Sequence, residues 1–254
     1  AAAMLNGLKV VGKKIDEIKV VFSGAGAAAL ASANHLVCIG VPRENIWMCD
    51  VKGLVYRGRK EEMFAEKEAF AQGDMFASLS NVMEGADIFI GLSTANIVTE
   101  EMLKRMRSAP VIFAMANPDP EIKYELARKA RPDAIVGTGR SDYPNQVNNL
   151  LGFPFIFRGA LDVRATEIND EMKIAASKAL ALLAKETPSQ DVLDAYGLKN
   201  LEFGPDYILP KPLDKRVCLW EAPAVARAAM DSGAARKSID LHDYVLELEH
   251  RLMG

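Results

Sequence analysis

The chain has little of what marks several large classes of protein. It contains three cysteines in 254 residues, none in a CxxC spacing, which indicates neither a disulfide framework nor a cysteine-based metal site. No apolar run reaches the ~20 residues that cross a bilayer, and no basic and apolar leader opens the chain. We therefore expect a cytoplasmic protein that is neither embedded in a membrane nor exported.

An excess of charge of one sign is also missing. The formal net charge is -3, and the Lys and Arg residues are scattered, so the electrostatic footprint that nucleic acid requires is absent. The three histidines, His35, His242 and His250, have no paired ligand spacing. Because half of the residues are hydrophobic, the chain can bury a large core. These features indicate a globular protein without a nucleic-acid partner.

Short β-branched runs alternate along the first part of the chain with segments of helical character. This order is typical of parallel βαβ units with right-handed crossovers. The sequence therefore predicts an α/β fold of the Rossmann type, with a doubly wound, mostly parallel sheet, flanking helices and a C-terminal helical extension. The predicted strands are Ile18–Phe22, Ile46–Cys49, Asp87–Gly91, Val111–Met115 and Ala134–Val136, and the predicted helices are Ala27–Ile39, Glu61–Ala71, Glu100–Arg107 and Glu121–Lys129.

The pattern suggests three regions along the chain. The chain does not begin with an initiator methionine, and the apolar residues within 1–17 already follow a helical spacing. We therefore expect residues 1–17 to end a helix that continues from a missing N-terminal domain. Residues 18–160 form the predicted dinucleotide-binding domain. Residues 161–254 contain the long amphipathic segment Glu167–Lys185 and two further helices, a helical extension that packs on the sheet or on a partner subunit.

A glycine-rich turn follows the first predicted strand. Residues 24–29 match the GxGxxG/A pattern directly before a predicted helix. Gly24 permits the tight turn, Gly26 lets the backbone approach a pyrophosphate, and Ala27 and Ala28 belong to the first helical turn, whose amides attract phosphate. A turn selected only for its geometry is the alternative. The strand and helix on either side favour dinucleotide binding.

Asp50 ends the second predicted strand, where an acid commonly accepts hydrogen bonds from the adenosine ribose. Basic residues follow it, among them Lys52 and Lys67, and these could pair with the 2′-phosphate of NADP. A solvated loop aspartate and a surface rich in Glu and Lys are the simpler alternatives. The basic residues favour NADP over NAD, while an Asp50 facing a phosphate would be repulsive, so both cofactors stay open.

Two asparagine-containing segments follow later predicted strands. Asn117 lies at the carboxyl end of a strand, where open α/β sheets bind ligands, and Asn149 ends a polar segment after the next strand. An amide both donates and accepts, which suits a ligand with hydroxyl and carboxylate oxygens. Turn chemistry explains either asparagine taken alone.

Taken together, these stretches resemble the cofactor domain of bacterial malic enzymes. The matching segments keep the family's order and spacing: Lys19–Ala28, Cys49–Leu54, Met115–Pro120, and Asn148 with Asn149 through Pro154. The resemblance covers essentially the whole chain. It is closest to the bacterial type in which this domain is fused to a phosphotransacetylase-like region.

The resemblance implies oxidative decarboxylation of L-malate to pyruvate and carbon dioxide, with reduction of NADP or NAD and with Mg²⁺ or Mn²⁺ in the complete enzyme. It assigns the cofactor to residues 24–28 and Asp50, places Ser93 beside the nicotinamide ribose, and makes Asn117 and Asn149 substrate-binding residues. A small loop residue is the equal alternative for Ser93. The family's tyrosine, lysine and carboxylate metal ligands would all precede Ala1.

We therefore expect no catalytic residue and no metal ligand in this chain. The prediction is that the chain binds cofactor but does not turn over malate alone, and that the complete enzyme is a homo-oligomer. One alternative is another hydroxy-acid or amino-acid dehydrogenase with the same fold, because fold alone does not determine substrate. A different alternative is a non-catalytic nucleotide-binding module, which would also lack acid, base and metal ligands.

Overall fold

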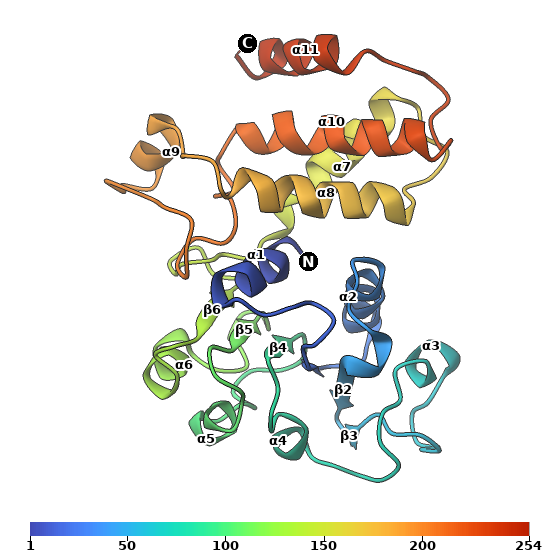
Figure 1. Cartoon of the computed structure of the whole chain (residues 1–254), viewed down its shortest axis with the longest axis vertical. Helices are drawn as coiled ribbons and strands as arrows, with labels where there is room; N and C mark the ends of the chain where they lie inside the picture. Colours follow the sequence, from blue (N-terminus) through green and yellow to red (C-terminus); the bar gives the residue numbers. More distant parts are fainter. Residues whose placement is uncertain (254) are drawn as a thin grey trace. The chain divides into compact units, whose positions relative to one another are not determined.

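The computed structural model describes residues 1–253. The chain divides into two compact units, each described separately below. Unit 1 comprises Ala1 and Ala3–Val147, and unit 2 comprises Ala2 and the residues from Asn148 onward. Figure 1 follows the chain from its blue N-terminal helix to its red C-terminal one.

Unit 1 is built on a six-stranded sheet with the order β3-β2-β1-β4-β5-β6. All neighbouring strands pair in parallel except β3, which runs antiparallel to β2. The central strands are fully buried runs of apolar residues, as expected for a sheet covered on both faces. The strands are β1 (Val20–Ser23), β2 (Ile46–Asp50), β3 (Gly53–Leu54), β4 (Ile88–Gly91), β5 (Val111–Ala114) and β6 (Ile135–Thr138).

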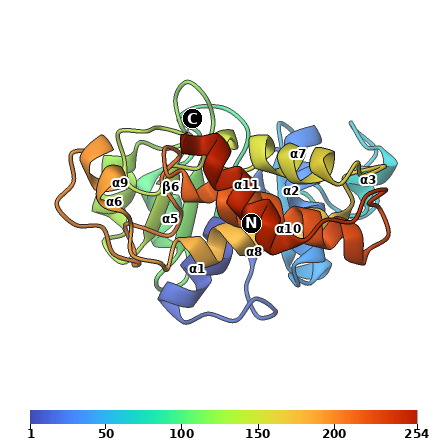
Figure 2. The same ribbon diagram turned by 90° about the horizontal axis from the view of Figure 1, so that it is seen from above.

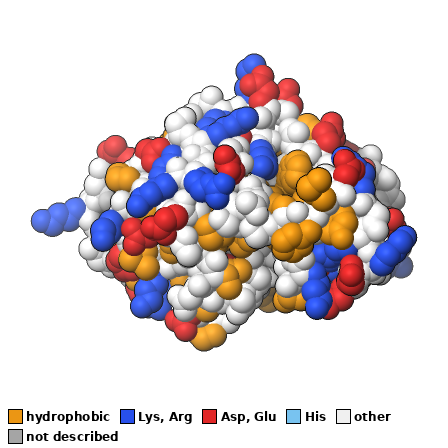
Figure 3. Space-filling model, turned by 90° about the horizontal axis from the view of Figure 1, so that it is seen from below, with side chains coloured by type: hydrophobic (Ala, Val, Ile, Leu, Met, Phe, Trp, Pro, Cys, Tyr) orange, Lys and Arg blue, Asp and Glu red, His pale blue; other side chains and the backbone are white. Residues whose placement is uncertain are grey.

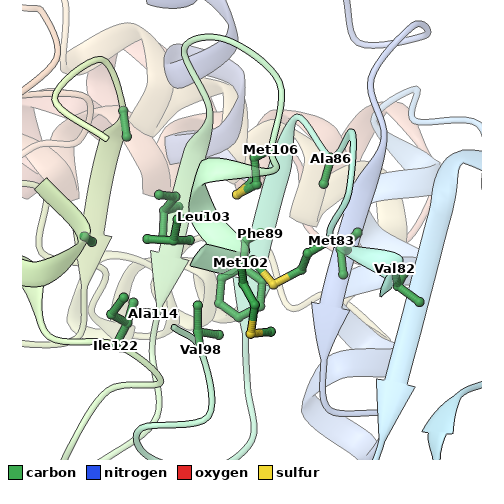
Figure 4. Close-up of a cluster of buried hydrophobic side chains, with 14 of the residues drawn as sticks. Val82, Met83, Ala86, Phe89, Val98, Met102, Leu103, Met106, Ala114 and Ile122 are labelled. Carbon is green, nitrogen blue, oxygen red and sulfur yellow. The ribbon is translucent and has the colours of Figure 1, made fainter. Parts of the chain in front are cut away.

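Helices cover the two faces of this sheet. One face carries a core in which Phe89 of β4 and Ala114 of β5 pack against Met83, Met102 and neighbouring side chains of the connecting helices (Figure 4). On the other face the first helix approaches β5 closely, because a Cβ on Gly7 would lie 3.3 Å from the Val111 side chain. The helices of unit 1 are α1 (Ala2–Val11), α2 (Ala27–Cys38), α3 (Ala65–Glu68), α4 (Leu79–Val82), α5 (Glu100–Lys104) and α6 (Tyr124–Ala130), with a 3₁₀ turn at Arg43–Asn45.

Unit 2 is helical. The long helix α10 packs against both α7 and α8, and α11 packs on α10 (Figures 1 and 2). Gly159 allows α7 and α10 to touch, since a Cβ there would lie 2.4 Å from the Ala222 carbonyl oxygen. The helices are α7 (Phe153–Asp162), α8 (Asp170–Leu183), α9 (Gln190–Ala195), α10 (Arg216–Asp231) and α11 (Leu241–Met253), with a 3₁₀ turn at Asn149–Leu151.

The predicted fold class is confirmed, and the five predicted strands are found within a few residues of their expected bounds. The helix expected over 61–71 is wrong, because Glu62 has a φ of 53° and only Ala65–Glu68 is helical. The helix expected from Glu121 begins at Tyr124 instead. The three predicted regions of the chain stay a prediction.

Two further features concern the surface and the membrane. On the face drawn in Figure 3, Lys and Arg side chains are interspersed with Asp and Glu, and hydrophobic side chains gather in a patch. This agrees with the scattered charges of the sequence. Within residues 1–253, no helix is both long and apolar enough to cross a bilayer.

Candidate dinucleotide-binding site

The site lies where the direction of the chain across the sheet reverses. From β1 the chain proceeds to β2 on one side, while β4, β5 and β6 follow on the other side. Ligands of open α/β sheets bind outside the carboxyl ends of the strands at such a point. The ends of β1 and β4 are joined directly, because the amide of Leu92, the residue after β4, donates to the carbonyl oxygen of Ser23, the last residue of β1, at 2.8 Å.

The glycine turn has the geometry that a pyrophosphate requires. Gly24 has a φ of 111°, and a Cβ there would lie 2.5 Å from the Leu92 carbonyl oxygen, so this position accepts only glycine. Gly26 caps α2, and a Cβ there would meet nothing within 4 Å. The backbone is therefore open to a close ligand at Gly26, directly before the first turn of a 12-residue helix. These residues fit a dinucleotide.

A cavity of about 850 Å³ opens beside the turn. It brings together five of the residues that the sequence predicted for the cofactor: Gly24, Gly26, Asp50, Lys67 and Ser93. The other lining residues are Ser23, Ala25, Cys49, Val51, Glu62, Met63, Phe64, Leu79, Thr94 and Ile97. Ala27 and Ala28 are exposed in the first turn of α2, and Lys52 is exposed next to Val51. These three do not line the cavity in this structure.

Asp50 is the centre of an ion cluster at one side of the cavity. Its carboxylate accepts hydrogen bonds from both terminal nitrogens of Arg59, one of them at 3.0 Å, and lies 2.5 Å from the Lys67 ammonium nitrogen. The Lys52 amide donates to it at 2.8 Å. Burial by itself would raise the pKa of Asp50, but these hydrogen bonds outweigh it and lower the pKa to about 2.

This cluster changes the interpretation of the basic residues. Lys67 is buried, and it also donates to the Glu62 carbonyl oxygen at 2.8 Å, so it is held in place by the protein. Arg59 is 5% exposed and is a residue that the sequence reasoning did not single out among its basic neighbours. Asp50, Arg59 and Lys67 together carry one net positive charge. The repulsion expected between Asp50 and a 2′-phosphate is therefore offset by its own partners.

Part of the cavity wall is apolar. Its side chains come from the residue after β2, from the segment between β3 and α3, from α4 and from the loop after β4. Two of these residues are unusually exposed for their type: Val51 at 88% and Phe64 at 48%. A flat aromatic ring buries its faces well against such side chains. The sequence analysis missed this wall, since its members are scattered along the chain: Val51, Met63, Phe64, Leu79 and Ile97.

Ser93 begins a polar chain in the loop after β4, which lies on the other side of β1 from the end of β2 at Asp50. Its hydroxyl oxygen lies 2.7 Å from that of Ser23, the last residue of β1. Its backbone amide donates to the buried carboxyl group of Glu121 at 3.0 Å. Neither Ser23 nor Glu121 was predicted as a site residue. A serine at a strand end and a glutamate after a proline carry no specific signal on their own.

The two predicted substrate residues lie in different units. Asn117 is exposed in the loop after β5, at the same edge of the sheet as Gly24 and Ser93. Asn149 is exposed at the start of the 3₁₀ turn that precedes α7 in unit 2. Over residues 1–253, no group of three or more His, Cys, Asp and Glu side chains has an arrangement that could hold a metal ion.

Comparison with known proteins assigns the family. The family model described as "Malic enzyme, NAD binding domain" matches residues 1–193. The chain belongs to this family. This match confirms the resemblance inferred from the glycine turn, the Asp50 segment and the asparagine segments. It favours the malic enzyme family over the alternative of another hydroxy-acid or amino-acid dehydrogenase.

Several curated proteins are similar over nearly the whole chain. An NADP-dependent malic enzyme of Salmonella typhimurium is 55% identical over 97% of this chain, and an NAD-dependent malic enzyme of Rhizobium meliloti is 53% identical over 100% of it. This chain spans 33% of the length of either relative. The solved malic enzyme of Pyrococcus horikoshii superposes with a TM-score of 0.85 at 37% identity, over 97% of this chain and 56% of that one.

Proposed function

We propose that this chain is the cofactor-binding part of an enzyme that oxidises and decarboxylates L-malate to pyruvate and carbon dioxide, with NADP preferred over NAD. The observation that carries the proposal is the cavity at the reversal point of the sheet, where the Gly24 turn and the Asp50 cluster face one ligand-sized space. The family to which the chain belongs supports the choice of a dinucleotide.

Each part of the site has a distinct task in this proposal. The open backbone at Gly26 takes the pyrophosphate, and the apolar wall beside Val51 takes the adenine ring. Arg59 and Lys67 leave a net positive charge beside Asp50, which favours a ligand with an additional phosphate. Ser93 lies toward the nicotinamide ribose, and the exposed Lys52, next to the lining residue Val51, adds a further cation. The amide groups of Ala27 and Ala28 complete the phosphate site.

The chemistry also needs groups outside this site. When bound, the nicotinamide ring supplies the acceptor for the hydride that leaves malate. Asn117 and Asn149 bind the hydroxyl and carboxylate oxygens of the substrate, and Mg²⁺ or Mn²⁺ belongs to the complete enzyme. We further propose that catalytic acid, base and metal ligands come from another part of the enzyme, and that the enzyme is a homo-oligomer in the cytoplasm. Cys38, Cys49 and Cys218 form no disulfide, as is usual in a reducing compartment.

A binding experiment tests the proposal. We expect calorimetric titration of the 254-residue chain to give tighter binding of NADP than of NAD. Gly26→Ala should abolish binding of both without changing the unfolding midpoint, because its Cβ enters only the ligand's space. Gly139→Ala is the matched control, since a Cβ there also meets nothing within 4 Å. No binding by the unaltered chain, or equal losses in the two variants, would contradict the proposal.

The preference for NADP has its own test. Lys67→Met should weaken binding of NADP by about tenfold more than binding of NAD, because only NADP carries the additional phosphate. Lys52→Ala should act in the same direction but less, and Lys60→Ala, an exposed neighbour, should leave both affinities unchanged. Equal losses for the two cofactors would assign Lys67 to the support of Asp50 alone. Addition of malate, Mn²⁺ and NADP to the chain should produce no NADPH.

A further inference from the structure

Glu121 is a buried carboxyl group that joins two loops at the ligand edge of the sheet. It is 0% exposed, and the sequence placed it in a helix that in fact begins later. One oxygen, Oε1, accepts from the Ser93 amide at 3.0 Å and lies 3.4 Å from the Ser93 hydroxyl. The other, Oε2, accepts from the Ala116 amide at 3.0 Å. The carboxyl group therefore bonds the loop after β4 and the loop after β5 at the same time.

Gly91, the last residue of β4, provides the space for this carboxyl group. A Cβ at Gly91 would lie 2.2 Å from the carboxyl carbon of Glu121, and 2.4 Å and 2.6 Å from its two oxygens. Gly91 has no positive φ in this structure. Its need for glycine therefore comes from the Glu121 side chain and not from the backbone conformation.

The backbone strengthens the same connection. The Asn96 amide donates to the Pro120 carbonyl oxygen at 3.1 Å, and the Val98 amide donates to that of Glu121 at 3.1 Å. On its other side, Ser93 contacts Ser23 through the two hydroxyl groups, 2.7 Å apart. The ends of β1, β4 and β5 are thus linked in one polar chain below the cavity. Asn117 follows Ala116 directly, so this chain ends at a residue proposed to bind substrate.

We infer that Glu121 is a positioning residue for the reactive end of the cofactor: it fixes the Ser93 loop and the Asn117 loop relative to each other, while the adenosine end is held independently by the Asp50 cluster. The inference rests on the proposed function, which places the nicotinamide ribose at Ser93. Its physical basis is that one carboxyl group presents two acceptors, each matched to an amide of a different loop.

Glu121→Gln is the sharpest variant, because it keeps the size of the side chain. A glutamine has one oxygen acceptor, and its NH₂ group would face an amide donor, so one of the two loops loses its bond. We expect the affinity for NADPH to fall about tenfold, by calorimetry or by the fluorescence of bound NADPH. Binding of 2′,5′-ADP, which contains only the adenosine end, should not change.

Glu101→Gln is the matched control, since Glu101 is exposed on α5 and should leave both affinities unaltered. If Glu121→Gln weakens NADPH and 2′,5′-ADP equally, the residue supports the whole unit and the inference is overturned. If it weakens neither, the inference is likewise overturned. If the unaltered chain binds neither NADPH nor 2′,5′-ADP, the proposed function has failed. Measuring the unaltered chain beside the variants distinguishes this result from a failure of the inference about Glu121.

A double-mutant cycle with Gly91 tests the same inference without relying on glutamine. Gly91→Ala should displace the carboxyl group and reproduce the selective loss of NADPH binding. In the Glu121→Ala background, the added Gly91→Ala should cost nothing further, since its Cβ then meets no carboxyl group. Additive losses in the cycle would show that Gly91 acts through another contact and would contradict the inference.

Discussion

Units 1 and 2 each bury a glutamate completely, but the hydrogen bonding of the two carboxyl groups differs. In unit 1, Glu121 accepts hydrogen bonds from two loops. In unit 2, Glu221 of α10 is also 0% exposed, but neither of its carboxyl oxygens has a hydrogen-bond partner among the described residues. Burial raises the pKa of Glu221 to about 9. A carboxyl group can therefore be buried either with donors or in its neutral form.

Asp50 extends the contrast, since its partners lower its pKa to about 2 while the burial of Glu221 raises its own to about 9. The pKa of Asp50 thus lies below its ordinary value and the pKa of Glu221 lies above its own, although the two ordinary values are similar. The difference comes from Arg59 and Lys67, which have no counterpart around Glu221. This leads to four predictions, from the largest expected effect to the smallest.

Arg59→Met removes one of the cations that pair with Asp50 in unit 1. The surroundings of the Asp50 carboxylate should then be more like those of Glu221. Breaking one side of a buried ion pair should lower the free energy of unfolding by about 3 kcal/mol. The pKa of Asp50 should rise from about 2 toward its ordinary value, because it loses one of its two ion-pair partners among residues 1–253 and keeps Lys67. Urea unfolding measures the first effect, and NMR titration of Asp50 measures the second.

Arg57→Met is the control for this experiment. Arg57 is exposed and pairs with Asp74 at 3.2 Å on the surface, so its loss should cost less than ~1 kcal/mol. Equal costs for the two arginines would mean that the Asp50 cluster adds nothing to stability.

Glu221→Leu should have the opposite sign. It replaces a carboxyl group without partners by an apolar side chain of similar size, within a cluster of buried apolar residues on α7, α8 and α10. We expect the free energy of unfolding at pH 8 to increase by about 2 kcal/mol. Glu171→Leu on the exposed side of α8 should change it by less than ~0.5 kcal/mol. A loss of stability in Glu221→Leu would show that the carboxyl group has a stabilising contact.

The pH dependence of stability should carry the mark of Glu221. Its pKa in the folded chain, about 9, lies above its ordinary value of 4.5, so the unfolded chain releases the proton first as the pH rises. The contribution of Glu221 to the free energy of unfolding is therefore complete below about pH 4.5. It declines up to about pH 9, with a slope of at most ~1.4 kcal/mol per pH unit. Glu221→Gln should flatten the stability profile over this window. Identical profiles for the two proteins would rule the shift out.

Ser93→Ala should have the smallest effect. It removes the contact of 2.7 Å with the Ser23 hydroxyl but leaves the Ser93 amide bonded to Glu121. The free energy of unfolding should fall by about 1 kcal/mol in urea unfolding. A loss as large as that of Arg59→Met would mean that the hydroxyl, and not the Glu121 carboxyl group, holds the loops together.

Sequence patterns predicted the parts of the fold that depend on local periodicity. The buried runs of β1, β4 and β5 are continuous and apolar, so their positions were evident. The helix expected over 61–71 was wrong, because Glu62 has a φ of 53° and only Ala65–Glu68 is helical. The short strand β3 also escaped prediction, because two residues give no pattern.

The residues of the candidate site also fall into those that local sequence patterns indicate and those that they do not. Gly24 and Gly26 could be singled out from the sequence because a motif fixes their spacing, and Asp50 because it ends a predicted strand. Arg59 and Glu121 were not singled out, because each acts through a partner in another segment: Asp50 is 9 positions from Arg59, and Ser93 is 28 positions from Glu121. The fold brings these partners together. The two asparagines were singled out from the resemblance, and their task stays a prediction.

The two outer strands of the sheet have a practical consequence for solutions of this chain. At one edge, β3 is only two residues long, and the amides of Leu54 and Val55 donate to Ala77 and Met48. At the other edge, the Val147 amide donates to the Thr138 carbonyl oxygen of β6 at 2.8 Å. Both borders thus offer few free backbone groups to a strand of another molecule. We expect the chain to resist edge-to-edge aggregation at the concentrations that calorimetry requires.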